Sequence, residues 1–79
     1  MDTIQPSTTH SGKWQIGDHE LTDGDVFEIQ IGSVWREVRV EYHPLLREQR
    51  LFFGDKNLPI IEGMRVQRLK PYLSPTAQA

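Results

Sequence analysis

Residues 26–42 read VFEIQIGSVWREVRVEY, with apolar and polar side chains alternating on both sides of a central Gly-Ser pair. A period of two is typical of a β-strand that buries one face. Gly32, at the interruption, supplies the positive φ that a type II′ turn requires. The pattern therefore predicts two antiparallel strands, residues 26–31 and 34–42, joined by the two-residue turn Gly32-Ser33.

The short turn also predicts the register of this hairpin. The expected pairs are Ile31 with Val34, Ile29 with Arg36, and Phe27 with Val38. Opposed residues point to the same side of a sheet, so the inner face is apolar except for Arg36. On the outer face Glu28 lies opposite Glu37, an unfavourable pair of like charges unless a cation such as Arg39 lies near. A slip of one residue would expose the apolar side chains, so their burial fixes the register.

Shorter runs with strand character lie on either side of the hairpin. They span residues 13–16, 50–53 and 64–69, and glycine-containing turn signals bound them. Pro44 disfavours helix at the residue before it, but it leaves room for a short helical turn within residues 44–49. Five short strands in so small a domain suit a closed or partly closed barrel, because closure removes exposed strand edges. The sequence thus predicts an all-β fold, a small five-stranded barrel.

The chain has 79 residues, enough for one domain with a small core. Residues 1–11 are polar and show no periodicity, which indicates a disordered N-terminal tail. The barrel is expected over residues 12–70, with Trp14 in its core. Residues 71–79 contain two prolines and several small side chains, and they are expected to form a flexible C-terminal tail.

Composition argues against several classes of function. The chain has no cysteine, which removes disulfides, thiolate metal sites and cysteine nucleophiles. A small domain without disulfides is typical of the cell interior, so a cytoplasmic location is expected. No apolar run approaches the roughly 20 residues that span a bilayer, and no membrane association is expected. The net charge of −2 argues against broad electrostatic binding to nucleic acid.

The sequence contains no pattern of catalytic or metal-ligating residues. The histidines are far apart and lack ligand spacing; they are His10, His19 and His43. No serine has the context of a nucleophile elbow. Asp23-Gly24-Asp25 does not fit an EF-hand loop, and it predicts a turn in which an aspartate bonds nearby backbone amides. We therefore expect no enzymatic activity, no metal and no cofactor.

Trp35 is the leading candidate for a binding residue. Alternation places it on the outer face of the hairpin, with Glu37 and Arg39. An exposed tryptophan next to an arginine is a natural anchor for a peptide or a base. The alternative is that a strongly curved strand packs Trp35 inside the molecule. The favoured hypothesis is a non-enzymatic interaction module that binds another protein through this face or through a barrel rim.

A second hypothesis uses the basic end of the chain. Arg65, Arg68 and Lys70 lie on or just after the last predicted strand, and with Arg36 or Arg39 nearby they can contact phosphate. This arrangement indicates a nucleic-acid-binding domain. Cations at a strand edge also keep a protein soluble and prevent strand addition, so a purely structural role stays open. The sequence leaves the oligomeric state open as well.

A longer motif includes many of these residues. It reads Leu21-x-x-Gly24-Asp25-x-x-Glu28-Ile29-x-Ile31, then Trp35 and Arg39-Val40-Glu41, and it continues through Phe52-Phe53-Gly54, Leu58-Pro59 and Glu62-Gly63-Met64-Arg65-Val66. The motif resembles a bacterial domain-of-unknown-function family of short SH3-like β-barrel proteins. The resemblance covers about residues 13–69. It implies a small SH3-like five-stranded barrel, and it implies no reaction, cofactor or established site.

A weaker likeness points to an enzyme. Three short motifs are similar to plasmid-borne dihydrofolate reductases, which are short SH3-like barrels that form a homotetramer around a shared pore; they are Gly24-Asp25, Gly32-x-x-Trp35 and Val66-Gln67. In that family an apolar residue, a tyrosine and a proline follow the glutamine. This chain has Arg68 in place of the apolar residue, and a cation there would disturb a stacked pterin. The likeness implies a reductase homotetramer as a remote alternative, on fold analogy alone.

Overall fold

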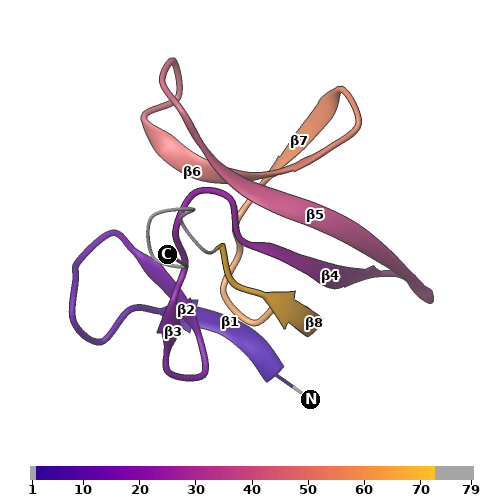
Figure 1. Ribbon diagram of the computed structural model, residues 1–79, viewed down its shortest axis with the longest axis horizontal. Helices are drawn as coiled ribbons and strands as arrows, with labels where there is room; N and C mark the ends of the chain where they lie inside the picture. Colours follow the sequence, from indigo (N-terminus) through magenta and orange to yellow (C-terminus); the bar gives the residue numbers. More distant parts are fainter. Residues whose placement is uncertain (1, 73–79) are drawn as a thin grey trace, which may run out of the picture.

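The computed structural model describes residues 2–72, which form one antiparallel sheet of eight strands. The strands are β1 (Asp2–Pro6), β2 (Trp14–Ile16), β3 (His19–Glu20), β4 (Val26–Ile31), β5 (Val34–His43), β6 (Glu48–Phe53), β7 (Lys56–Pro59) and β8 (Arg65–Lys70). Their order across the sheet is β3-β2-β1-β8-β4-β5-β6-β7, and the sheet curls into a half-barrel (Figure 1). Within residues 2–72 there is no helix able to cross a bilayer.

The all-β prediction is confirmed, but the expected number of five strands is wrong. The additional strands are β1, β3 and β7, which are five, two and four residues long. Runs this short contain too few apolar positions to show a period of two. Strands β3 and β7 lie at the two ends of the sheet order and do not pair with each other. The described sheet is therefore open, and each end strand leaves an unpaired edge.

Strand β1 replaces part of the predicted N-terminal tail. It pairs with β2, where Ile4 lies opposite Ile16, and with β8, where Thr3 lies opposite Arg65. Ile4 is completely buried, and its backbone exchanges hydrogen bonds with residues 63 and 64 of the turn before β8. A single apolar residue among polar neighbours gives no periodic signal, which is why the sequence indicated disorder here. Of the predicted C-terminal tail, only residues 71 and 72 lie within the described residues.

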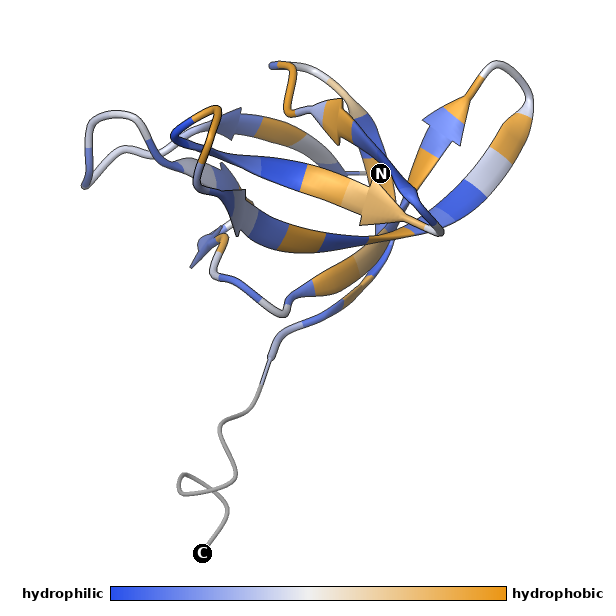
Figure 2. Ribbon diagram, turned by 90° about the horizontal axis from the view of Figure 1, so that it is seen from above, coloured by the Kyte–Doolittle hydropathy of each residue, from blue (hydrophilic) through white to orange (hydrophobic). Residues whose placement is uncertain are grey.

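The central hairpin has the predicted register. Phe27 lies opposite Val38, Ile29 opposite Arg36, and Ile31 opposite Val34. The φ of Gly32 is 62°, whereas that of Ser33 is not positive, as expected for a type II′ turn. Apolar and polar bands alternate along the strands, as Figure 2 shows.

The next hairpin, β5–β6, turns through residues 44–47. The backbone N–H of Arg47 donates to the carbonyl oxygen of His43 at 2.8 Å, which closes a single turn with helical spacing. Arg47 itself has a φ of 56° and returns the chain into β6. The structure thus contains the short helical turn that the sequence allowed after Pro44, but the turn does not continue into a helix.

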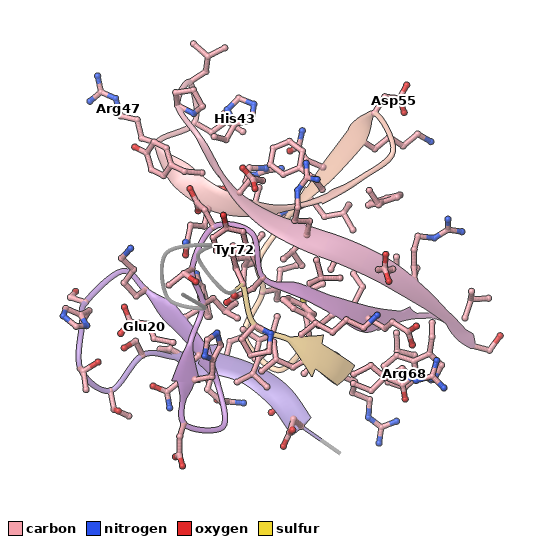
Figure 3. The ribbon with its side chains drawn as sticks, viewed as in Figure 1. Glu20, His43, Arg47, Asp55, Arg68 and Tyr72 are labelled. Carbon is pink, nitrogen blue, oxygen red and sulfur yellow. The ribbon has the colours of Figure 1, made fainter. Side chains whose placement is uncertain are left out.

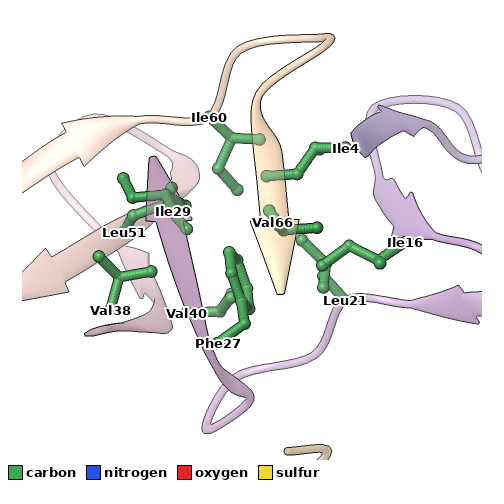
Figure 4. Packing of buried hydrophobic residues seen from close by; sticks show 10 residues of the cluster. All are labelled: Ile4, Ile16, Leu21, Phe27, Ile29, Val38, Val40, Leu51, Ile60 and Val66. Atoms are coloured by element: carbon green, nitrogen blue, oxygen red, sulfur yellow. The ribbon is translucent and has the colours of Figure 1, made fainter. Parts of the chain in front are cut away.

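The core lies on the concave side of the half-barrel and takes side chains from both halves of the sheet (Figure 4). Its buried members are all aliphatic or aromatic: Ile4, Ile16, Leu21, Phe27, Ile29, Val38, Val40, Leu51, Ile60 and Val66. Trp14 packs against this cluster but is only half-buried, so its predicted place in the core is confirmed in part. Phe27 and Ile29 are completely buried, and their burial holds the β4–β5 register.

Candidate functional site

Strands β8, β4, β5 and β6 present a second face, turned away from the core. We call the central part of this face the outer face, and define it by these side chains: Val26, Glu28, Gln30, Trp35, Glu37, Arg39, Phe52, Arg65, Gln67 and Lys70. Three rows cross the strands. In the first row Trp35 lies opposite Gln30, whose side chain accepts a hydrogen bond from Arg65. Gln67, Glu28 and Glu37 form the second row, and Lys70, Val26, Arg39 and Phe52 form the third.

The outer face brings together the five residues that the sequence singled out. Trp35, Glu37 and Arg39 alternate along β5, with the core residue Val38 between the last two. Arg65 comes from β8, and its Nη1 donates to Oε1 of Gln30 at 3.4 Å. Gln30 is in turn paired with Trp35. The fifth residue, Arg68, reaches this face through an irregularity in β8.

That irregularity is a β-bulge. Val26 pairs with Lys70 and Glu28 with Gln67, so β8 has one more residue than β4 between these two pairs. At Arg68, which lies within the bulge, the backbone leaves the extended conformation and takes a left-handed φ of 57°. Its Nη1 lies 3.5 Å from Oε2 of Glu28, and this contact places its charge on the outer face (Figure 3).

Trp35 is half-buried on the outer face and is not among the side chains packed against the core. Two other half-buried apolar side chains, Val26 and Phe52, share this face and are likewise not packed on the core cluster. The ring of Phe52 stacks on that of His43, with centroids 6.3 Å apart and an angle of 9° between the planes. The outer face therefore carries a small apolar set of its own.

A shallow pocket of about 270 Å³ opens on this face, between β4, β5 and the end of β6. Its lining includes Val26, Phe52 and Gly54, together with the charged side chains Glu37 and Arg39. Gly54 begins the turn to β7, and a Cβ at this position would have no other atom within 4 Å. A site of this kind can hold one side chain of a binding partner.

The like-charged pair that the register predicted is present, but the cation that offsets its negative charge comes from β8 and not from β5. Glu28 and Glu37 lie directly opposite each other. Oε1 of Glu28 accepts a hydrogen bond of 2.7 Å from Nε2 of Gln67, and its Oε2 lies 3.5 Å from Arg68. The expected cation, Arg39, instead lies 3.4 Å from Oε1 of Glu41. Strand β8 therefore compensates Glu28, and this was not visible in the hairpin sequence.

The sequence did not identify five of the residues that line the pocket as site residues, namely Val26, Val38, Phe52, Phe53 and Gly54. Val26 lies at an outward position in the alternation of residues 26–31, and an outward valine carries no functional signal. Phe52 belongs to the run Leu51-Phe52-Phe53, where continuous apolar residues hide which side chain faces outward. The pocket also needs the β5–β6 register, which places Phe52 opposite Arg39.

A second polar cluster surrounds Asp25, which is completely buried. Its carboxylate lies 2.6 Å from Nε2 of His19 and accepts hydrogen bonds from the backbone N–H groups of Thr22 (2.9 Å) and Tyr72 (2.7 Å) and from the Thr22 hydroxyl (3.2 Å). The predicted turn at Asp23-Gly24-Asp25 is thus confirmed. The cluster attaches the end of the described chain to this turn, so we assign it a structural role (Figure 3).

A third cluster is centred on Glu20 at the exposed end of the sheet. Its Oε2 lies 2.8 Å from Nδ1 of His10 and accepts hydrogen bonds from the hydroxyls of Ser7 and Thr9. The bond to His10, supported by both hydroxyls, lowers the pKa of Glu20 below its ordinary value of 4.5, against a smaller opposing effect of burial. In the described part of the chain, no three His, Asp or Glu side chains gather closely enough to hold a metal ion.

Comparison with protein-family models, with curated proteins and with solved structures finds no match for this chain.

Proposed function

We propose that this chain is a non-enzymatic interaction domain with an SH3-like barrel fold, which binds another protein through its outer face. The observation that carries the proposal is the pocket of about 270 Å³ that Glu37 and Arg39 line, on the same side of the hairpin as Trp35. The motif running from Leu21 to Val66 supports the same fold and kinship with the bacterial family that it resembles.

The energetics of this face favour a protein partner. Val26, Trp35 and Phe52 are each half-buried, so a partner can remove further apolar area from water without unfolding the domain. Aromatic residues in a partly desolvated setting dominate the affinity of many protein interfaces. The polar residues around them carry both signs of charge, which is typical of an interface rim and provides specificity.

Nucleic acid is a second candidate, because the bulge of β8 brings Arg68 onto the same face as Arg65 and Trp35. An aromatic ring beside two arginines suits a stacked base and its phosphates. Acidic side chains are interspersed on this face, however, and Glu28 already lies within 3.5 Å of Arg68. A phosphate backbone would meet that negative charge, so this candidate ranks second.

Affinity capture with the full chain from a lysate of the host tests both candidates. The capture is run at low salt, with and without nuclease, using the wild type and Trp35→Ala. Leu45→Ala is the control, because Leu45 is 87% exposed on the turn between β5 and β6 and lies outside the outer face. We expect a protein that survives nuclease, is lost with Trp35→Ala and is retained with Leu45→Ala.

Other results would contradict the proposal. Binding that disappears with nuclease and weakens steeply with salt would favour nucleic acid. A partner captured equally by all three chains would show that the outer face is not the binding surface.

A further inference from the structure

The charged side chains around the pocket differ in whether they already have partners. Arg39 lies 3.4 Å from Oε1 of Glu41, so it already has an acidic partner. Glu37 lines the pocket, but it makes no ion pair and accepts no side-chain hydrogen bond from any of residues 2–72. Glu37 is therefore the charge that the pocket offers to a ligand.

A second carboxylate adds to the negative potential at this point. Glu28 lies directly opposite Glu37 across the hairpin, where side chains on one face begin about 5 Å apart. Glu28 is only partly neutralised, because Arg68 is 3.5 Å away and its side chain is 72% exposed. A cation placed at Glu37 would offset the repulsion between the two carboxylates.

Part of the pocket wall is apolar, and the charged side chains Glu37 and Arg39 line the rest of it. Val26 and Phe52 lie on opposite sides of Arg39 in the same row, and both contribute to the lining. A volume of about 270 Å³ falls below the roughly 300–1,000 Å³ of pockets that enclose drug-sized ligands. The space therefore suits one long side chain and is too small for a cofactor.

We propose that the pocket receives a lysine or arginine side chain of the partner, with Glu37 as the counter-ion. This inference rests on the proposed function of the outer face. The aliphatic part of such a side chain packs against Val26 and Phe52 while its charged end stays at the rim. An acidic side chain would be repelled by Glu37 and its neighbour Glu28, because the cation of the pocket, Arg39, is already paired with Glu41. An apolar side chain would cover Glu37 without replacing its hydration.

Nuclear magnetic resonance titration of the full chain tests this chemistry directly. The probes are the capped peptides Gly-Ser-Arg-Ser-Gly and Gly-Ser-Lys-Ser-Gly, and the control replaces arginine by citrulline, its neutral isostere. We expect both basic peptides, at millimolar concentration, to shift the amide signals of Glu37, Arg39 and Gly54. The citrulline peptide should leave those signals in place. Equal shifts with citrulline, or shifts confined to other strands, would overturn the proposal.

Two variants complete the test. Glu37→Gln keeps the shape of the side chain and should weaken the basic peptides about tenfold. Glu62→Gln removes an exposed acid from the turn between β7 and β8, outside the outer face, and should leave binding unchanged. Unchanged affinity with Glu37→Gln would contradict the inference.

The two proposals can fail separately. A captured protein that depends on Trp35 but binds Glu37→Gln as tightly as the wild type would support the interaction domain. It would contradict the proposal that a basic side chain of the partner enters the pocket. Peptide binding at Glu37 without any Trp35-dependent protein would leave the chemistry of the pocket in place and remove the proposed function.

Discussion

At the scale of single residues, the two tryptophans have opposite surroundings. Trp14 packs against the core cluster, whereas Trp35 lies on the outer face and is not part of that packing. The sequence predicted this difference, with Trp14 expected in the core and Trp35 expected on the outer face. The strand pairing distinguishes them, because Trp14 lies in β2 opposite Pro6 and Trp35 lies in β5 opposite Gln30.

This difference predicts unequal effects on stability. Trp14→Ala should lower the free energy of unfolding by about 3 kcal/mol, the low end for a buried tryptophan, because Trp14 is only partly buried. Trp35→Ala should cost less than about 1 kcal/mol, the range for a cross-strand pair at the surface. Urea unfolding followed by far-UV circular dichroism measures both. Equal losses would mean that Trp35 belongs to the core and is not a free anchor.

Glu20 predicts a dependence of stability on pH. Its pKa is lowered in the folded state, mainly by the hydrogen bond with His10, so the folded protein binds its proton less readily than the unfolded chain. The stabilisation is present above the ordinary value of 4.5 and is lost as the pH falls through the lowered pKa. Glu20→Gln should therefore be less stable than the wild type at about pH 6, and the difference should shrink by about pH 3.

The matched control for this prediction is Glu62→Gln, because Glu62 is exposed and has no ion pair among the described residues. It should follow the wild type across the same pH range. Unfolding curves at several pH values give the comparison. A difference between Glu20→Gln and the wild type that grows in acid would have the wrong sign and would contradict the assigned role of the His10 hydrogen bond.

At the scale of elements, the turn before β4 connects two parts of the chain that are far apart in sequence. Gly24 has a φ of 96°, and a Cβ there would lie 2.7 Å from the ring of Tyr72. The carboxylate of Asp25, the next residue, accepts a hydrogen bond from the backbone N–H of Tyr72. The turn thus requires glycine both for its backbone conformation and for the close approach of a ring.

Gly24→Ala tests this contact. The strained φ and the clash together should lower the free energy of unfolding by about 2 kcal/mol. In a Tyr72→Ala background, Gly24→Ala should cost less than it does in the wild type. The clash with the ring is then absent, and the backbone strain and the close approach of the Cβ of residue 72, at 3.1 Å, remain. Gly12→Ala is the control: it has a φ of 81° but no neighbour within 4 Å. Equal losses in both backgrounds would mean that Tyr72 does not pack on the turn.

At the scale of the whole molecule, the open sheet leaves two edges, β3 and β7. Strand β3 has two residues, and β7 carries Lys56 and Pro59 at its ends. Short length, a lysine and a proline each hinder pairing with another chain. The outer face, with both signs of charge, is also poorly suited to a permanent interface between copies.

These features predict a monomer. Size-exclusion chromatography with light scattering at micromolar concentration should give the mass of one chain, 9.2 kDa. A homotetramer would contradict this prediction. It would also favour the reductase alternative, and an assay of dihydrofolate reduction with NADPH would then test for that activity.

The features that the sequence could predict are those that depend on residues close together in the chain. Alternation and Gly32-Ser33 are local, so the β4–β5 hairpin, its register and the outward direction of Trp35 followed from residues 26–42. The turn at Asp23-Gly24-Asp25 was predicted for the same reason. Local signals failed for β1, since a strand with one buried residue gains its stability from β2 and β8.

The features that could be recognised only in the tertiary structure are those that depend on strands far apart in sequence. The bulge at Arg68, the compensation of Glu28 by β8, and the pocket between Val26, Glu37 and Phe52 all depend on the pairing of β4 with β8 and of β5 with β6. Alternation states which way a side chain points along one strand. It does not state which strand lies beside it, because that choice is made by the shared burial of residues such as Ile4, Val66 and Leu51 in one core.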